Sequence, residues 1–352
     1  MQCVILAGGY GTRLRPLTYT RQKVLLPVMN KPMIIHIIDA LPAEVDRIIV
    51  AANYKKEQIE RYFEIYPIPG KEVIVNTEPK PLGTAGAVKH AEKYLNGTFM
   101  VVNSDIVSSL NTGDLLDFHR MKNSVATISL WPVENVSEFG VVSVTDEGCI
   151  DMFVEKPLPE EAPSNLINAG HYCLEPEILD MIPAGEFTSM EKDIFPQVIR
   201  KHGRLCGFRF TGYWIDLGKV QNYLLAHKLI IEKNGMKRTY IEGTGCRNAG
   251  TLDYSSIGDG VVVGQKTVIT SSVVFNGTTI GNDSHIISTV IGEKCRIGSR
   301  CRIINSVIGD EHVVPDGCIL ENAVVWNKDI PEGYPEQQVG NVVRDIVRDK
   351  KM

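Results

Sequence analysis

The sequence lacks long apolar runs and any concentration of charge of one sign. Its longest apolar stretches, such as residues 33–38, are far shorter than the roughly 18 residues that a membrane span needs. The 37 Lys and Arg residues nearly balance the 42 Asp and Glu residues, which leaves a net charge of −5. A nucleic-acid-binding protein usually carries a concentrated basic face. The sequence therefore argues against a membrane protein and against a nucleic-acid partner.

Paired cysteines and a secretion signal are also missing. The eight cysteines are scattered with no Cys-x-x-Cys, so zinc and thioredoxin-type chemistry are unsupported. The N-terminal residues have neither the basic start nor the long apolar run of a signal peptide. A disulfide framework is not expected in such a chain. We expect a cytoplasmic protein.

The first two thirds of the chain, residues 1–235, have the pattern of an α/β domain. Short apolar segments rich in β-branched residues alternate there with amphipathic ones. The predicted strands are 3–6, 47–51, 72–77, 98–102 and 125–132, and the predicted helices are 55–65 and 84–95. Ligands of open α/β sheets bind beyond the carboxyl ends of the strands. Functional residues are therefore expected in the loops that follow these strands.

Residues 243–332 carry a different pattern, in which an aliphatic residue precedes a recurring glycine. Gly264, Gly281 and Gly298 are 17 residues apart, and Gly292 and Gly298 are six apart. Six-residue sides and coils of nearly 18 residues predict a triangular parallel β-helix. Hexapeptide repeats of this kind resemble those of left-handed β-helices. We expect the tail, 333–352, to cap the last coil.

A glycine-rich loop follows the first strand directly. Gly8, Gly9 and Gly11 allow backbone N–H groups to approach a polyphosphate, and the cations Arg13 and Lys23 come next. The segment is not a P-loop, because Gly-Lys-Ser/Thr is absent, and it does not match the dinucleotide fingerprint. The pattern indicates a phosphate-binding site.

The whole opening resembles the sugar-1-phosphate nucleotidyltransferases. The segment 7–18 reads Ala-Gly-Gly-Tyr-Gly-Thr-Arg-Leu-Arg-Pro-Leu-Thr, and Lys-Val-Leu-Leu-Pro-Val and Asn-Lys-Pro follow it. One departure is that Lys23 lies between Gln22 and Val24, where the family often has prolines. The resemblance implies a Rossmann-like nucleotidyltransferase domain with a mixed sheet. It also implies a reaction in which a nucleoside triphosphate and a sugar 1-phosphate give a nucleoside-diphosphate sugar and pyrophosphate.

The resemblance assigns roles to residues that are ambiguous by themselves. Taken alone, Asp105 and Asp216 are each more typical of a strand end or a turn than of a metal site. In the family, aspartates at these positions hold the catalytic Mg²⁺. Arg13 and the glycine loop would hold the β- and γ-phosphates, and Lys23 the α-phosphate or the attacking phosphate. Arg13, Lys23 and Asp105 are therefore the predicted catalytic residues. The predicted nucleotide-binding residues are Leu6, Ala7, Gly8, Gly9, Gly11, Thr12, Glu78, Gly83 and Thr84.

Four further positions match the family's sugar side. Lys156 would bind the sugar phosphate, Glu155 and Asn168 would bind sugar hydroxyls, and the backbone at Gly140 would add a contact. From the residues alone, Glu155 and Lys156 are equally an exposed ion pair, and Asn168 a turn residue.

The choice of base depends on Glu78. Guanine offers two adjacent N–H donors, which a carboxylate matches, whereas uracil or thymine suits an amide. A solvated glutamate is the alternative. The segments 81–86, 103–105 and 188–196 and the short C-terminal β-helix also resemble mannose-1-phosphate guanylyltransferases. We therefore expect GTP and mannose 1-phosphate to give GDP-mannose.

Other functions remain open at this stage. The nearest is the same reaction with dTTP or UTP and glucose 1-phosphate. A non-catalytic regulatory subunit that binds nucleotide sugar should have lost one of the charged site residues, and all are present. A solenoid acyltransferase using His285 or His312 is disfavoured by the small repeat region. Flat faces of the β-helix suit symmetric association, so we expect a homo-oligomer.

Overall fold

The computed structural model describes residues 1–233, 240–326 and 342–343. The chain divides into two compact units. The first comprises Met1–Gly9 and Ile34–Trp214, and the second comprises Tyr10–Met33 and Ile215–Met352. The segment that follows the first two loop glycines therefore belongs with the C-terminal part of the chain. The predicted capping tail, 333–352, lies outside the described residues except for Val342–Val343.

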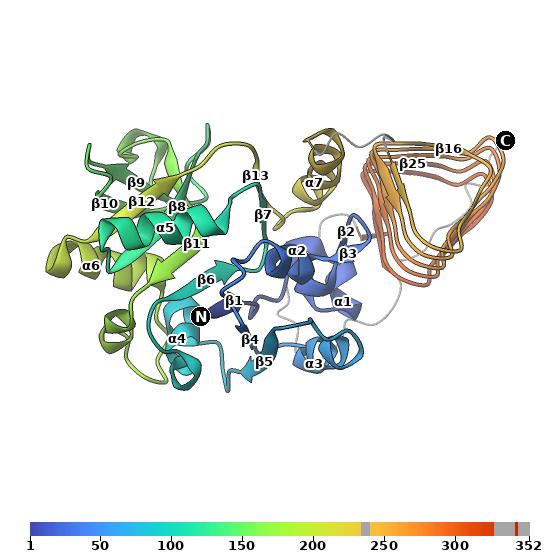
Figure 1. Cartoon of the computed structure of the whole chain (residues 1–352). Coiled ribbons are helices and arrows are strands. Elements are labelled where there is room, and N and C mark those ends of the chain that lie inside the picture. The colour runs from blue at the N-terminus through green and yellow to red at the C-terminus, as the bar shows by residue number, and fades with distance from the viewer. Residues whose placement is uncertain (234–239, 327–341, 344–352) are drawn as a thin grey trace. The chain divides into compact units, whose positions relative to one another are not determined.

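A nine-stranded mixed sheet forms the centre of the first unit, as expected (Figure 1). The strands β1, β4, β5 and β6 run parallel to one another, whereas β11 is antiparallel to its neighbours β6, β8 and β9. The strands are β1 (Gln2–Leu6), β4 (Arg47–Ala52), β5 (Glu72–Thr77), β6 (Phe99–Asn103), β8 (Ala126–Pro132), β9 (Gly140–Val144), β10 (Ile150–Glu155), β11 (Leu166–Leu174) and β12 (Leu205–Arg209).

Helices pack on the sheet, and the central strands carry apolar residues on both faces. Cys3, Val4 and Ile5 of β1 have no exposed surface, as expected for parallel strands covered on both sides. Helix α5 begins at a side-chain cap, where Asn111 Oδ1 accepts from Gly113 N at 3.0 Å. The helices of this part are α2 (Met33–Asp39), α3 (Lys56–Ile65), α4 (Gly83–His90), α5 (Thr112–Lys122) and α6 (Phe195–His202).

The parallel register aligns the carboxyl ends of four strands. Leu6 of β1 lies beside Ala51 of β4 and Asn103 of β6, and Ala51 lies beside Asn76 of β5. The loops after these strands therefore leave the sheet from one edge. The antiparallel strand β11 reaches the same edge, because a Cβ at Gly170 would lie 2.8 Å from Asn103 Nδ2.

The predicted strands agree with the structure to within about one residue, but one predicted helix was too long. The helix expected over 84–95 ends at His90, and Glu92–Tyr94 forms a separate 3₁₀ turn. The N–H of Ala91 is shared between the carbonyls of Ala87 and Val88. This shared bond tightens the last turn and ends the α-helix.

Three parallel sheets build the β-helix of the second unit, in the arrangement consistent with a left-handed β-helix; its triangular outline is visible in Figure 1. One sheet contains β14 (Tyr240–Glu242), β17 (Ser255–Ile257), β20 (Val273–Val274), β23 (Val290–Ile291), β26 (Val307–Ile308), β29 (Val324–Val325) and β30 (Val342–Val343). The second contains β15 (Arg247–Asn248), β18 (Val262–Val263), β21 (Thr279–Ile280), β24 (Arg296–Ile297) and β27 (Val313–Val314). The third contains β16 (Thr251–Asp253), β19 (Val268–Thr270), β22 (His285–Ile287), β25 (Arg302–Ile304) and β28 (Ile319–Glu321).

Each regular coil is 17 residues long, which the strand register shows directly. Val263 pairs with Ile280, Ile280 with Ile297, and Ile297 with Val314, and these side chains are buried. The sequence therefore predicted the inward-facing positions correctly, with a coil one residue shorter than the regular eighteen.

Polar side chains between strands join neighbouring coils. In five of these contacts a side-chain oxygen accepts from the backbone N–H of the residue 17 positions earlier. The acceptors are Asn276, Asn282, Ser299, Asp310 and Asp316. An amide, a hydroxyl and a carboxylate oxygen all serve in this position.

The cysteines and His312 have structural surroundings. All eight cysteines are free thiols, and Cys295 and Cys301 lie inside the β-helix. His312 Nδ1 lies 3.1 Å and 3.0 Å from the carbonyl oxygens of Gly309 and Asp310, so this nitrogen carries the proton that it donates. The ring is thereby fixed against its own turn.

In the residues that the structure describes, the strands and α-helices not yet named are four short strands and two helices. They are α1 (Leu17–Thr20), β2 (Pro27–Val28), β3 (Lys31–Pro32), β7 (Ile106–Ser108), β13 (Trp214–Asp216) and α7 (Val220–Lys233). In the described part of the chain, no helix has the length and apolar character needed to cross a membrane.

Candidate active site

A buried carboxylate lies at the carboxyl edge of the sheet in the first unit. Glu78 follows β5 and is 6% exposed. Its Oε2 accepts from Leu82 N at 3.1 Å, and its Oε1 lies 3.3 Å from the position that a Cβ on Gly8 would take. Burial raises the pKa of Glu78, although the Leu82 hydrogen bond and His90 oppose that shift. The solvated-glutamate alternative is therefore wrong, and one carboxylate oxygen points toward the glycine-rich loop.

Two asparagines beside Glu78 escaped the sequence analysis. Asn76 lies near the end of β5, two residues before Glu78, and is 5% exposed. Asn53 follows β4, and a Cβ on Gly8 would lie 3.9 Å from its Nδ2. Among the described residues, Asn53 Oδ1 and Asn76 Nδ2 are buried without a hydrogen-bond partner. Unpaired buried polar atoms are costly, which suggests that a ligand uses them. In the sequence, the feature that could have identified these asparagines was their position at the ends of two neighbouring strands.

Gly83 and Thr84 anchor a neighbouring loop. Gly83 has a φ of +74°, and a Cβ there would lie 2.5 Å from the carbonyl oxygen of Thr188. That same oxygen accepts from the backbone N–H groups of Ala85 and Gly86. These contacts fix helix α4 against the loop. The predicted nucleotide contact of Gly83 and Thr84 stays a prediction.

Glu191 is a third residue that the sequence did not mark individually. Its Oε2 accepts from the hydroxyls of Thr84, at 2.8 Å, and Ser189, at 2.7 Å. The hydroxyl of Tyr172 donates to its Oε1 at 3.2 Å and in turn accepts from Asn168 Nδ2 at 2.9 Å. Asn168 is therefore oriented by a buried tyrosine and a carboxylate. The segment 188–196 carried this signal as a resemblance only.

Gly140, Glu155 and Lys156 come together where β9 meets β10. A Cβ on Gly140 would lie 2.6 Å from Phe153 Cζ and 2.9 Å from Glu155 Oε2, so a larger residue would displace both side chains. Burial and the nearby Glu191 raise the pKa of Glu155. Lys156 Nζ lies 4.0 Å from Glu155 Oε1, and 61% of the Lys156 side chain is exposed. This is a half-buried acid beside an exposed base, rather than a wholly exposed ion pair.

Asp105 lies at the same edge of the sheet. Asp105 is the second residue after β6. The residue before it, Ser104, donates its N–H to the carbonyl oxygen of Leu6 at 3.3 Å. This bond continues the pairing of β1 with β6 past the last paired strand residues. The half-buried Asp105 is thus held close to the start of the glycine-rich loop.

The second unit gathers the predicted phosphate-binding cations. Gly11 has a φ of +63° and begins the 3₁₀ turn Thr12–Leu14. A Cβ on Gly11 would lie 2.8 Å from Thr18 Cγ2 and 3.3 Å from Lys23 Cβ. The glycine-rich loop and the segment that begins at Lys23 are therefore in contact. Lys23 is only 8% exposed, whereas Arg13 is exposed.

Arg13 and Asp216 meet at Gly218. A Cβ on Gly218 would lie 2.5 Å from Arg13 Nη2 and 2.8 Å from Asp216 Oδ1. The N–H of Gly218 donates to Asp216 Oδ1 at 2.6 Å, and Asn222 Nδ2 donates to the carbonyl oxygen of Asp216. The carboxylate is therefore held in one orientation beside a guanidinium group.

The donor chemistry fits the predicted magnesium ion. Asp105 and Asp216 offer carboxylate oxygens, which Mg²⁺ prefers, and Asp216 is already oriented by Gly218. Within the described residues, no three His, Cys, Asp or Glu side chains form a metal-binding group. Mg²⁺ held by one or two carboxylates and substrate phosphates does not require such a group.

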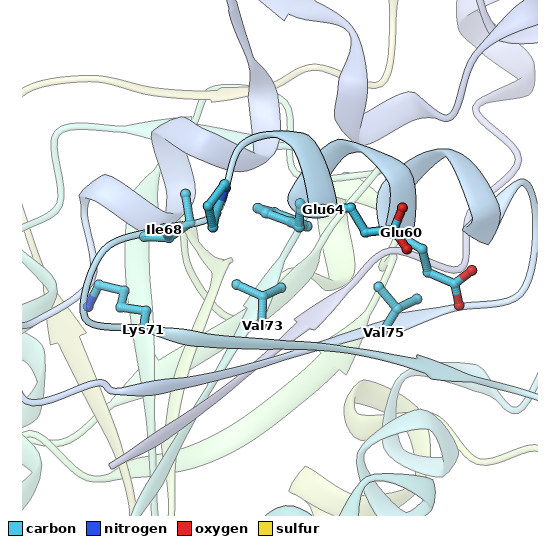
Figure 2. A pocket seen from close by; sticks show the side chains of 8 residues that line it. Glu60, Glu64, Ile68, Lys71, Val73 and Val75 are labelled. Carbon is cyan, nitrogen blue, oxygen red and sulfur yellow. The ribbon is translucent and has the colours of Figure 1, made fainter.

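A pocket of 380 Å³ lies elsewhere, between α3 and the edge strand β5. Figure 2 shows Val73 and Val75 on the strand beneath Glu60 and Glu64 of the helix. Its strand residues precede the carboxyl end of β5, so it is separate from the Glu78 site.

Comparisons with known proteins find matches to both parts of the chain. Residues 2–233 match the family model described as nucleotidyl transferase, and residues 248–339 match the model described as the GMPPB C-terminal domain. A mannose-1-phosphate guanyltransferase from Yarrowia lipolytica is 42% identical over 234 residues, which are 64% of this chain and 62% of that protein. The matched region thus spans somewhat less than two thirds of that relative.

Two solved structures are similar as well. HddC from Yersinia pseudotuberculosis, solved in complex with GMP-PN, is 29% identical with a TM-score of 0.53 and covers 64% of this chain and 97% of its own. A UDP-glucose pyrophosphorylase solved with UDP-glucose is 26% identical with a TM-score of 0.57 and covers 64% of this chain and 96% of its own.

Replacing Gly218 with alanine should displace Arg13 and Asp216 without disturbing the fold. The added methyl group meets the ends of these two side chains, at Arg13 Nη2 and Asp216 Oδ1, and both ends can move. A hydrogen bond to a charged group contributes about 1.5–3 kcal/mol, so binding of a nucleoside triphosphate should weaken about 10- to 100-fold. Isothermal titration calorimetry measures the affinity, and thermal unfolding checks the fold. Gly113→Ala at the start of α5 is the control, and equal affinities in both variants would contradict the placement of Arg13.

Proposed function

Because this chain belongs to the nucleotidyl transferase family, we propose that it transfers a guanylyl group from GTP to mannose 1-phosphate. The products are GDP-mannose and pyrophosphate. The observation that carries the choice of nucleotide is Glu78, a buried carboxylate with one oxygen directed at Gly8. The name of the Yarrowia lipolytica relative supports the same pair of substrates.

The transfer needs positioning and charge neutralisation more than it needs a base. An oxygen of the sugar phosphate attacks the α-phosphorus of the nucleotide, and the bond to the bridging oxygen breaks, so that pyrophosphate leaves with the electron pair. The attacking oxygen is already anionic and has no proton to lose. Arg13 and Lys23 carry the positive charge that balances the developing charge on the phosphates.

Asp105 and Asp216 would hold a magnesium ion in this scheme. The ion would supply Lewis-acid polarisation of the α-phosphate and charge neutralisation of the leaving group. Gly218 keeps Asp216 oriented for this task through its N–H. Arg13 lies beside Asp216, so the same part of the chain would bind both the metal and the phosphates.

Base selection follows from complementary hydrogen bonding. Glu78 Oε2 already accepts from Leu82 N, which leaves Oε1 to accept from the guanine N–H groups. A uracil or thymine would present a carbonyl oxygen to the same carboxylate, and two acceptors repel each other. Asn53 and Asn76 supply further buried polar atoms beside this position.

On the sugar side, an exposed cation lies next to oriented acceptors. Lys156 would bind the phosphate of the sugar, with Glu155 and Asn168 bound to its hydroxyls. Asn168 is held by Tyr172 and thus indirectly by Glu191. Fixed acceptors of this kind distinguish sugars that differ at one hydroxyl.

We also propose a cytoplasmic homo-oligomer that associates through the β-helix. All eight cysteines are free thiols, which suits a reducing compartment. Val313 and Ile319 of the β-helix are 65% and 68% exposed, and exposed apolar side chains favour association. Sedimentation velocity should show an oligomer for the chain and a smaller species for Val313→Asp with Ile319→Asp. A monomeric wild-type chain would contradict this proposal.

The decisive experiment measures pyrophosphate release over a grid of nucleoside triphosphates and sugar 1-phosphates. GTP with mannose 1-phosphate should be the preferred pair, and chelation of Mg²⁺ should abolish turnover. Preference for UTP or dTTP with glucose 1-phosphate would keep the reaction and overturn the substrates. Nucleotide-sugar binding without turnover in any combination would indicate the regulatory subunit instead.

The metal assignment is tested within the same assay by Asp105→Asn. Loss of a metal ligand removes several kcal/mol of transition-state stabilisation, so turnover should fall at least about 100-fold while the fold persists. Asp114→Asn, an exposed aspartate in the first turn of α5, is the matched control. Unchanged activity of Asp105→Asn would remove Asp105 from the site.

Glu78→Gln should shift the preference from GTP toward UTP or dTTP. An amide in place of the carboxylate presents a donor as well as an acceptor, and such mismatches are worth about 1–3 kcal/mol, or about 5- to 160-fold. Because the pKa of Glu78 is raised, the KM for GTP should increase on acidification earlier than for an ordinary glutamate, and Glu78→Gln should lack this dependence. Glu72→Gln at the exposed start of β5 is the control. An unchanged nucleotide ranking would exclude Glu78 from base recognition.

A further inference from the structure

The segment Tyr10–Met33 contains the predicted phosphate-binding residues Arg13 and Lys23, and we call it the phosphate-binding segment. An ion-pair cluster joins it to the β-helix. Arg21, two residues before Lys23, donates from Nη2 to Asp310 Oδ2 at 2.6 Å and from Nη1 to Glu293 Oε1 at 3.0 Å. Thr20 Oγ1 donates to the same Asp310 oxygen at 2.6 Å. Two consecutive residues of the segment are thereby held by two coils of the solenoid.

This cluster is largely withdrawn from water. The side chains of Arg21 and Asp310 are 14% and 7% exposed, and the Arg21 guanidinium lies over the ring of Phe275, 4.9 Å from its centroid. Burial alone would lower the pKa of Arg21, but Asp310 and Glu293 more than offset this and raise it. The Arg21 guanidinium therefore stays charged, and a buried ion pair is strongly sensitive to loss of one partner.

Two further contacts hold the same segment on the β-helix. On one side of the cluster, Tyr19 packs on Trp326, with ring centroids 5.1 Å apart. On the other side, Asn30 Nδ2 donates to the carbonyl oxygen of Ile257 at 2.7 Å, and Ser256 Oγ donates to Asn30 Oδ1 at 2.7 Å. Lys23 lies between these points of attachment.

The connection from Arg21 to Lys23 is short and rigid. Gln22 Oε1 accepts from Val24 N at 2.6 Å and caps the 3₁₀ turn Lys23–Leu25. Lys23 is 8% exposed, and its Cβ lies against Gly11. A displacement of Arg21 would therefore move Lys23 and the Gly11 turn with it.

We propose that the β-helix positions the phosphate-binding segment, and that Asp310, assisted by Glu293, is a positioning residue that acts through Arg21 on Lys23. The inference rests on the proposed function, because it assumes that this segment binds the triphosphate. It assigns the solenoid a part in nucleotide binding in addition to self-association.

The chemistry of Asp310 separates this role from solenoid folding. Its Oδ1 accepts from Glu293 N at 2.8 Å and thus joins two coils. Asn276 and Asn282 make the equivalent bond with an amide oxygen. The solenoid therefore requires only one side-chain acceptor oxygen there, whereas Arg21 and Thr20 use the second carboxylate oxygen.

The test compares Asp310→Asn with Asp316→Asn. Asp316 also accepts a coil-joining bond, from Ser299 N at 2.9 Å, but its side chain is 53% exposed and its nearest cation, Arg300, lies 3.9 Å away. Asp310→Asn should raise the KM for the nucleoside triphosphate about 10- to 100-fold, the cost of misplacing a binding group by about an ångström. In Asp310→Asn, the KM for the sugar 1-phosphate should stay close to wild type. In Asp316→Asn, the thermal midpoint should stay close to wild type.

A double-mutant cycle with Arg21→Gln identifies the pathway. If Asp310 acts through Arg21, the double variant should lose no more affinity than the worse single variant. Additive losses, or a wild-type KM in Asp310→Asn, would overturn the proposal. If Asp310→Asn does not fold, Thr20→Val removes one hydrogen bond to the same oxygen without a charge change, and its unchanged nucleotide affinity would also overturn it.

The outcome is independent of which nucleotide the protein uses. Calorimetric titrations with GTP, ATP, UTP and dTTP report on the same segment without a sugar substrate. Equal affinity of wild type and Asp310→Asn for the preferred nucleotide refutes the positioning role. A preference for a nucleotide other than GTP refutes the proposed substrate and leaves the positioning role intact.

Discussion

Parallel backbone pairing of β1 with β4 and β6 is the constraint on which the arrangement of the predicted site residues in the first unit depends. Because Leu6 lies beside both Ala51 and Asn103, the chain leaves each of these strands at the same edge of the sheet. The glycine loop, Asn53 and Asp105 each come a few residues after one of these strand ends. They therefore start from the same edge of the sheet, although they are far apart in sequence. Pairing of β4 with β5 adds Glu78 to the same edge.

Burial gives the collected side chains their properties. A carboxylate with little exposed surface, such as Glu78, loses solvation and forms strong, selective hydrogen bonds to the donors that remain. Asn168 depends on Tyr172 and Glu191, which were not conspicuous in the sequence, because the orientation of an amide is set by its neighbours. Glycines at 83, 140 and 218 permit the close approaches, since a Cβ at any of them would meet another atom within 3 Å.

Periodic features were the most predictable from sequence. The spacing of Gly264, Gly281 and Gly298 fixed the coil and its inward-facing residues, because each coil repeats the same local pairing. The strands were located to within about one residue for the same reason. The helix predicted over 84–95 ended early, because the choice between α and 3₁₀ bonding at Ala91 is a local geometric matter that apolar spacing does not report.

The sequence by itself determined the α/β pattern, the solenoid and the identity of the signature residues, since these depend on local periodicity and on motif order. The tertiary structure alone decided that Glu78 is buried, that Asn53 and Asn76 accompany it, and that Arg13 meets Asp216 at Gly218. It also decided that Tyr10–Met33 belongs with the β-helix, through Arg21 and Asp310. Contacts between residues separated by hundreds of positions leave no periodic trace, because they arise only when folded surfaces meet.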